Sequence, residues 1–183
     1  MMKHDEILSQ LTTDAKNDAN ILGFFVFGSV ARGTQREDSD IDIMTIYRSK
    51  KPTSGIDNYP VVGIKVGNLF FTFDILVKSV EDVPYLLHPL GEAKLLFDRN
   101  GEVSPQLDLI KGYFADHPEI VEEWDGYYAL LKQEKAQFGY EKTTIVDVWN
   151  EMERRHAGKI RRKFFNSFLF TNSFIFSLLK KLM

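Results

Sequence analysis

Apolar and polar positions change their spacing several times along the first hundred residues, and each change predicts a new element. Residues 3–19 predict an amphipathic helix, because four apolar side chains share one helical face: Ile7, Leu8, Leu11 and Ala15. Residues 21–27 are an unbroken apolar run, which is typical of a buried strand. Residues 29–32 predict a short helix, and residues 33–39 a polar loop.

Further strands are predicted up to residue 98. Residues 40–47 predict a second strand, because apolar side chains recur at every other position. Gly67-Asn68 is a turn signal between two apolar stretches, which predicts a β-hairpin with strands over residues 61–66 and 69–77. Residues 48–60 are predicted to be an exposed loop, and residues 93–98 a short last strand.

Beyond residue 103 the spacing is that of helices. Ser104-Pro105 predicts an N-cap followed by proline at the first helical position, and Thr144 to Asp147 predicts a capping box. His156 lies on an apolar helical stripe, so we expect it to be packed or hydrogen-bonded and not catalytic. The predicted fold class is α/β (α+β), with a small mixed sheet over residues 1–102 and a helical C-terminal region over residues 103–183.

The turn at Gly28-Ser29 is a candidate phosphate site. A strand that ends in Gly-Ser and turns into a helix presents unpaired backbone N–H groups, and the serine hydroxyl adds another donor. Glycine lets the backbone approach an anion closely. The pattern therefore predicts that a triphosphate binds at this turn.

Three carboxylates are candidate ligands for a metal ion. Asp40 and Asp42 are two positions apart on a predicted strand, so their side chains leave the same face and repel each other unless a cation lies between them. Asp74 is a lone carboxylate in an apolar predicted strand, where burial without a partner is costly. If that strand pairs beside residues 40–46, the three carboxylates can hold Mg²⁺ ions.

Two rival motifs each fail at two required positions. Gly28 to Gly33 has the glycine spacing of a P-loop, but Thr34-Gln35 replaces the required Lys-Ser/Thr. Asp38 to Asp42 resembles the opening of an EF-hand loop, but the sixth position is Ile43 and the twelfth is Ser49. Neither an NTPase of the P-loop class nor an EF-hand is predicted.

The Gly28-Ser29 pair, the ten-residue spacing, Asp40-x-Asp42 and a later aspartate resemble the DNA polymerase β-like nucleotidyltransferase superfamily. Within it, residues 21–78 look most like bacterial aminoglycoside and lincosamide nucleotidyltransferases. The resemblance implies that Gly28 and Ser29 hold the β/γ phosphates and that Asp40 and Asp42 bind Mg²⁺. It also implies that Asp74 is a metal ligand, a general base or both, while Arg32 is a looser match for a residue that touches the triphosphate.

The resemblance implies a metal-dependent enzyme that moves a nucleoside monophosphate from an NTP, with ATP as first choice, to a hydroxyl, with release of pyrophosphate. A small-molecule acceptor, such as an antibiotic, is the first expectation. Two alternatives stay open: a protein-modifying nucleotidyltransferase of the toxin–antitoxin type, and a nucleotide-binding module without turnover.

Composition limits the binding partners and the cellular compartment that we expect for this chain. The chain of 183 residues has no cysteine, which excludes disulfides and thiolate zinc sites and fits a reducing cytoplasm. The N-terminus lacks an apolar stretch of signal-peptide length. Residues 143–183 carry eight Lys/Arg and three Asp/Glu, so residues 1–142 hold the acidic excess, which does not favour a nucleic-acid binder.

Residues 164–179 are rich in phenylalanine but are interrupted by Asn, Ser and Thr, and the segment is short for a membrane span. Such a surface is an aggregation liability if it is left bare. We expect it to cover the body of the protein, to form a homodimer contact or to wall the acceptor cleft, and not to enter a membrane.

Overall fold

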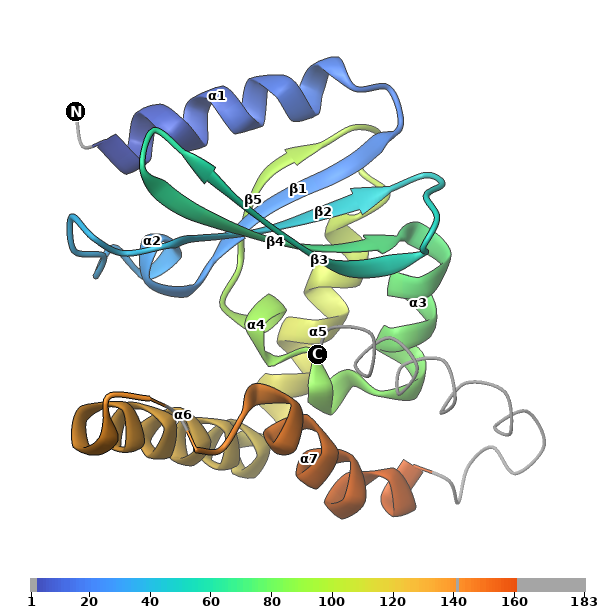
Figure 1. Ribbon diagram of the computed structural model, residues 1–183. Helices are drawn as coiled ribbons and strands as arrows, with labels where there is room; N and C mark the ends of the chain where they lie inside the picture. Colours follow the sequence, from blue (N-terminus) through green and yellow to red (C-terminus); the bar gives the residue numbers. More distant parts are fainter. Residues whose placement is uncertain (1–2, 141, 161–183) are drawn as a thin grey trace.

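The computed structural model describes residues 3–140 and 142–160. Its elements follow one another in this order: α1 (Lys3–Asn17), β1 (Ile21–Phe27), α2 (Gly28–Arg32), β2 (Ile41–Tyr47), β3 (Ser54–Val61), β4 (Ile64–Thr72), α3 (Phe73–Asp82), η1 (Pro84–Leu86), α4 (His88–Gly91), β5 (Lys94–Asp98), α5 (Ser104–Asp116), α6 (Pro118–Phe138) and α7 (Ile145–Ile160). Figure 1 shows α1 on one face of the sheet and α3 to α7 on the other.

The five strands form one mixed sheet in the order β3-β4-β2-β1-β5. The central pair β2–β4 is parallel, and the other neighbours are antiparallel. This mixed sheet with its helical C-terminal part confirms the predicted fold class. The expected division into domains at residue 102 stays a prediction.

Residues of the same strand are buried on opposite faces of the sheet, in two separate clusters. Ile41 and Ile43 of β2 pack with α1, whereas Met44 and Ile46 pack with the helices of the opposite face. Trp124 of α6 lies at the centre of that second core with no exposed surface, and its indole N–H donates to the carbonyl of Tyr85 at 2.8 Å. The helices therefore share a core with the face of the sheet that points away from α1.

Several local predictions are confirmed. The helix over 3–19, the strands over 21–27, 40–47 and 93–98 and the short helix after Gly28 all form, with ends shifted by two residues or fewer. The capping box is also present, since the Asp147 N–H donates to Thr144 Oγ1 at 3.2 Å and the Thr144 N–H donates to Asp147 Oδ2 at 2.8 Å.

The predicted hairpin is wrong in its position. The turn lies at Val62-Gly63, where both residues have positive φ (49° and 79°), and β3 occupies residues that we expected to form a loop. Gly67 and Asn68 lie in the middle of β4, where the Thr45 hydroxyl donates to Asn68 Oδ1 at 2.9 Å. Because valine rarely adopts a positive φ, the residue type at position 62 does not indicate a turn.

The predicted strand over 69–77 is confirmed over residues 69–72 and wrong beyond them, because β4 ends at Thr72 and a helix, α3, begins at Phe73. Apolar residues at positions 73, 76 and 80 fit a helical repeat, and the helix buries Leu76 and Val80 in the core. Asp74 is exposed in the first turn of that helix.

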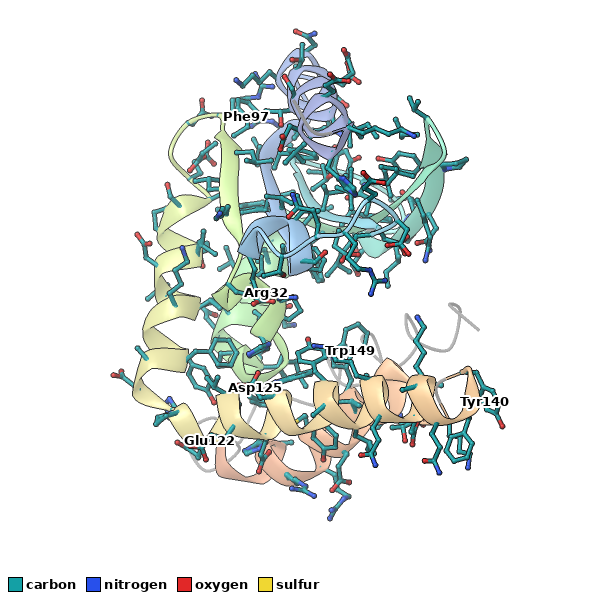
Figure 2. The ribbon with its side chains drawn as sticks, turned by 90° about the vertical axis from the view of Figure 1, so that its left-hand side faces the viewer. Arg32, Phe97, Glu122, Asp125, Tyr140 and Trp149 are labelled. Atoms are coloured by element: carbon teal, nitrogen blue, oxygen red, sulfur yellow. The ribbon has the colours of Figure 1, made fainter. Side chains whose placement is uncertain are left out.

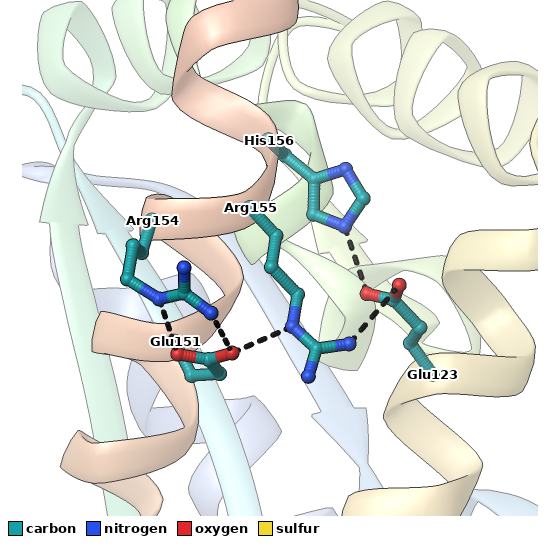
Figure 3. Close-up of polar contacts among 5 residues, drawn as sticks. All are labelled: Glu123, Glu151, Arg154, Arg155 and His156. Carbon is teal, nitrogen blue, oxygen red and sulfur yellow. Dashed lines mark hydrogen bonds and ion pairs between the residues drawn. The ribbon is translucent and has the colours of Figure 1, made fainter.

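His156 is a packed residue, as expected. It is 4% exposed, its Nε2 hydrogen-bonds to Glu123 Oε2 at 2.8 Å, and its ring lies 5.6 Å from that of Tyr85. Figure 3 shows that Arg155 contacts both Glu123 and Glu151. The contacts of His156 and Arg155 with Glu123 join α7 to α6.

None of the helices in the described part of the chain is long and apolar enough to cross a membrane. The phenylalanine-rich segment 164–179, for which we expected a covering or interface role, lies outside the described residues.

Candidate active site

The turn from β1 into α2 lies directly against a carboxylate. Phe27, the last residue of β1, pairs with Asp42 of β2, so the next residue, Gly28, passes beside the Asp42 side chain. Gly28 has φ +65°, and a Cβ at this position would lie 2.7 Å from Asp42 Oδ2. Glycine is therefore required here by backbone conformation and by close approach.

A second glycine flanks Asp42 on the other side. Gly67 of β4 pairs with Asp42 across the parallel ladder, and a Cβ there would lie 3.3 Å from Asp42 Oδ1. The Asp42 carboxylate receives no hydrogen bond from any residue in the described ranges. Burial raises the pKa of Asp42, and the neighbouring charge of Asp40 raises it further, while Lys65 and Arg32 act in the opposite direction.

Asp40 lies just before β2 and forms an ion pair with Lys65 of β4, in which Nζ and Oδ2 are 3.3 Å apart. Both side chains are about half exposed. The sequence analysis missed Lys65, because the register between β2 and β4 differs from the one that the expected hairpin implied. With Asp42, these residues give the site two carboxylates and one ammonium group.

The loop that carries Asp40 is tied to α1. His4 is buried, and its Nε2 hydrogen-bonds to the carbonyl of Ser39 at 2.9 Å. The Arg36 N–H donates to Ser39 Oγ at 2.8 Å within the same loop. Sequence analysis gave no role to His4, whose partner is 35 residues away. The hydrogen bond from His4 to the Ser39 carbonyl helps to fix the position of the neighbouring Asp40.

Arg32 ends α2 and forms an ion pair with Glu92, with 2.6 Å between Nη1 and Oε1. The positive charge of Arg32 opposes the pKa rise of Asp42, so the guanidinium lies within electrostatic reach of the carboxylate. The Ser29 hydroxyl has no hydrogen-bond partner in the described part of the chain, and the Ser29 carbonyl accepts from the Thr34 N–H at 3.0 Å. Both predicted phosphate contacts thus lie on the same short helix beside Asp42.

Side chains of the helical region face this end of the sheet. Burial raises the pKa of Tyr128 of α6, and the charges of Glu92, Arg32, Asp125 and Asp42 all act on it, so Tyr128 lies near the site. His88 stacks on Trp124 with 5.6 Å between ring centroids, and burial lowers its pKa.

Figure 2 shows Asp125 of α6 and Trp149 of α7 below Arg32, on the side of α6 that faces the sheet. Trp149 packs against the core between the sheet and the helices. Its Nε1 is buried and has no hydrogen-bond partner among the described residues. An indole N–H and a carboxylate are thus present on the helical side opposite α2.

Asp74 does not join Asp40 and Asp42, which corrects the expected three-carboxylate cluster. Gly67 is the neighbour of Asp42, and β4 continues for five more residues before α3 begins. A strand rises about 3.3 Å per residue, so Asp74 lies beyond a point roughly 16 Å along the sheet from Gly67. Within the described ranges, no group of three or more His, Cys, Asp or Glu residues could hold a metal ion.

The donor set still suits one hard cation. Asp42 has two carboxylate oxygens without hydrogen-bond donors, and the repulsion from Asp40 favours a cation between them. Mg²⁺ is commonly bound by one or two carboxylates, with water and substrate phosphates completing its shell. The side chains of Asp40 and Asp42 therefore fit the ligand chemistry of a Mg²⁺ ion.

A match between the amino-acid sequence and a family model identifies the family of this chain. The family model described as "Polymerase beta, Nucleotidyltransferase" matches residues 9–102, which is just over half of the chain. The chain belongs to the polymerase β nucleotidyltransferase family. The matched segment of this nucleotidyltransferase contains Gly28, Ser29, Arg32, Asp40 and Asp42.

No curated protein matches the nucleotidyltransferase in sequence. Among solved structures, it is similar to a nucleotidyltransferase-like protein from Exiguobacterium sibiricum 255-15, with a TM-score of 0.46 and 11% identity over 92% of this chain and 68% of the other. A toxin–antitoxin structure with AMP-PNP is similar with a TM-score of 0.32 and 16% identity, over 66% of this chain and 97% of that one. The assignment to the family rests on the sequence match.

Proposed function

We propose that the protein transfers a nucleoside monophosphate from an NTP, with ATP as first choice, to a hydroxyl group of a small molecule. The observation that carries the proposal is the contact between Gly28 and Asp42. This contact brings the backbone of the candidate phosphate turn next to a carboxylate that receives no hydrogen bond from the described residues. Aminoglycosides and lincosamides are the acceptor classes that the sequence resemblance suggests.

In this proposal the Gly28 and Ser29 region holds the β and γ phosphates, and Arg32 contacts the triphosphate. Asp40 and Asp42 hold Mg²⁺, which would neutralise charge on the phosphates and help pyrophosphate to leave. The acceptor hydroxyl attacks the α-phosphorus in line and loses its proton to water, while the bond between the α-phosphorus and the pyrophosphate oxygen breaks and pyrophosphate leaves. Positioning and charge stabilisation supply most of the rate enhancement in such reactions.

The acceptor would lie between α2 and the helical region. Asp125, Tyr128 and Trp149 supply a carboxylate, a phenol and an indole on that side. A carboxylate beside aromatic rings suits an acceptor with cationic groups, because the ring faces and the carboxylate both attract positive charge.

A second candidate is a nucleotide-binding module without turnover. The observation that favours it is the position of Asp74, which leaves the site with two carboxylates. The β4 residues beside Asp42 and Asp40 are Gly67 and Lys65, respectively, and neither is a carboxylate. With fewer carboxylates to hold metal ions, binding of a nucleotide is expected to survive better than its reaction.

One assay separates the two candidates. The protein is incubated with each NTP, Mg²⁺ and a panel of aminoglycosides, lincosamides and candidate protein acceptors, and pyrophosphate release is followed. Acceptor-dependent release supports the transferase. Nucleotide binding by calorimetry with no release for any acceptor on the panel favours the binding module.

The matched control is Asp42→Asn. A transferase should lose activity by roughly 100-fold or more in this variant, because charge developing on the phosphates loses a metal ligand. Release that continues unchanged in a folded Asp42→Asn protein would show that the activity comes from a contaminant or from another site.

A further inference from the structure

Lys65 of β4 lies on the same face of the sheet as Asp42. In the parallel ladder between β2 and β4, Asp42 pairs with Gly67. Two positions further along, Met44 pairs with Leu69, and both pack in the core under the helices. Side chains alternate between the two faces along a strand, so positions 65 and 67 of β4 share the helical face with Asp42. The candidate active site lies on this face.

The row of paired residues that crosses the sheet at Asp42 contains one carboxylate. It runs from Phe27 of β1 through Asp42 to Gly67 of β4 and Asn58 of β3. A Cβ on Gly67 would lie 3.3 Å from Asp42 Oδ1 and 3.5 Å from Asn58 Oδ1, so both oxygens border the space above this glycine. Asn58 is neutral. This side of Asp42 therefore offers a metal ion an amide oxygen and not another carboxylate.

The neighbouring row is occupied by an ammonium group. Lys65 Nζ lies 3.3 Å from Asp40 Oδ2. Burial raises the pKa of Asp42 and the charge of Lys65 opposes this rise, so the ammonium is within electrostatic reach of both carboxylates. In two-metal sites for phosphoryl transfer, the ions are about 3.5–4 Å apart and both need oxygen ligands. The Lys65 ammonium takes one of the few oxygen contacts that a second ion would need.

The Lys65 side chain can also contact a bound nucleotide. It is 59% exposed, and the Asp40 side chain is 47% exposed, so the ion pair is open to solvent. An ammonium group has three N–H donors, and the pair with Asp40 uses one of them. The other donors are free to bind phosphate oxygens, for which lysine is a common partner.

We propose that the nucleotide site binds a single divalent cation and that Lys65 takes the place of a second one. The divalent cation would bind to Asp40 and Asp42, and the ammonium would contact Asp40 and a phosphate oxygen of the nucleotide. A positive charge that belongs to the chain needs no set of carboxylate ligands, which fits a site with two carboxylates. This inference rests on the proposed nucleotide site and adds a phosphate-binding residue from outside the Gly-Ser and Asp-x-Asp motif.

The first measurement counts the metal ions. Mn²⁺ replaces Mg²⁺, and bound Mn²⁺ is measured by electron paramagnetic resonance on the full chain saturated with a non-hydrolysable ATP analogue. We expect one Mn²⁺ ion for each complex of protein and nucleotide. Two bound Mn²⁺ ions for each complex would overturn the proposal.

The second measurement compares the affinities of Lys65→Met, which removes the charge and keeps the length of the side chain. Without nucleotide, this variant should bind Mn²⁺ roughly fivefold more tightly than the parent, because a competing cation is gone. With saturating Mn²⁺, it should bind the ATP analogue at least about tenfold more weakly, because a charged donor to phosphate is lost. A general loss of structure would not change the two affinities in opposite directions.

Two further variants serve as checks. Lys65→Gln is a second neutral replacement at this exposed position and should change both affinities in the same directions as Lys65→Met. Lys111→Met, an exposed change on α5, should leave both affinities as in the parent. The proposal is overturned if Lys65→Met and Lys65→Gln bind the analogue as tightly as the parent, or if neither binds Mn²⁺ more tightly.

The outcomes also separate this inference from the proposed function. A parent protein that transfers nucleotides with two Mn²⁺ ions bound would overturn the inference and leave the proposed function in place. A parent that binds the analogue with one Mn²⁺ ion, depends on Lys65 and transfers nothing would support the inference and remove the transferase. A parent that binds no nucleotide would overturn both.

Discussion

Asp42 Oδ2 lies so close to the backbone of Gly28 that a Cβ on residue 28 would stand 2.7 Å from it. The contact joins the end of β1 to the metal-ligand candidate on β2. Residue 28 cannot carry a side chain without moving the carboxylate, so the conformation of the turn and the position of Asp42 depend on each other.

Gly28→Ala should therefore lose nucleotide binding and turnover by at least tenfold. Gly33→Ala is the matched control, because Gly33 also has positive φ (72°) but a Cβ there meets nothing within 4 Å. Both variants should lose about 1–2 kcal/mol of stability from the left-handed backbone. Calorimetric nucleotide binding and thermal unfolding measure the two effects. Equal nucleotide affinity in both variants would contradict a role for the Gly28–Asp42 contact.

Asp42→Asn should make the protein more stable at neutral pH while it abolishes activity. Burial and then the charge of Asp40 raise the pKa of Asp42 above its ordinary value of 3.8, so the folded protein holds that proton more tightly than the unfolded chain does. The Asp42 contribution to stability is full below pH 3.8 and falls as the pH rises through the folded pKa. The melting temperature of Asp42→Asn minus that of the parent should grow over this interval. Asp108→Asn, an exposed change on α5, should show no such growth.

The ion pair between Arg32 and Glu92 should compete with nucleotide binding. If Arg32 contacts the triphosphate, Arg32→Ala should weaken NTP binding by roughly tenfold or more, because a charge-assisted hydrogen bond is lost. Glu92→Gln should strengthen it by no more than about fivefold, since an exposed ion pair contributes under about 1 kcal/mol. Titration calorimetry with a non-hydrolysable NTP gives both values. Weaker binding in Glu92→Gln would mean that the pair is needed to orient Arg32.

Asp98 caps helix α5, a role that we had expected for Ser104. Its Oδ2 accepts from the Ser104 N–H at 2.9 Å and from the Ser104 hydroxyl at 2.6 Å. Although burial raises the pKa of Asp98, these bonds lower it overall. Stability from Asp98 is thus present above pH 3.8 and is lost as the pH falls through the folded pKa.

Asp98→Ala should cost about 1 kcal/mol in the free energy of unfolding at neutral pH, and less in acid. Denaturant unfolding at several pH values measures this. Asp116→Ala, exposed at the other end of α5, is the control. A pH-independent loss in Asp98→Ala would indicate that packing and not the capping carboxylate is responsible.

The sequence by itself determined the elements whose spacing is unambiguous. The apolar run of β1, the Gly28-Ser29 turn and the Asp40-x-Asp42 pair could all be placed, because each depends on neighbours a few residues away. Asp42 and the turn do meet, since β1 and β2 are adjacent antiparallel strands that bring Phe27 beside Asp42. Sequence spacing also predicted that His156 is packed.

Only the tertiary structure decided which residues lie beside Asp42. The chain turns at Val62-Gly63, so β4 runs parallel to β2 in the register that pairs Gly67 with Asp42 and brings Lys65 to Asp40. A positive φ at Val62 is unfavourable locally and is offset by the long β3–β4 ladder.

The position of Asp74 was also decided only by the tertiary structure. Residues 71–80 satisfy the strand period and the helical period equally well in their apolar positions, so spacing alone could not separate them. The choice came from burial, because a helix packs Leu76 and Val80 into the core beneath the sheet. That packing removes Asp74 from the candidate active site and places it in the wall of a cavity at the opposite end of the sheet.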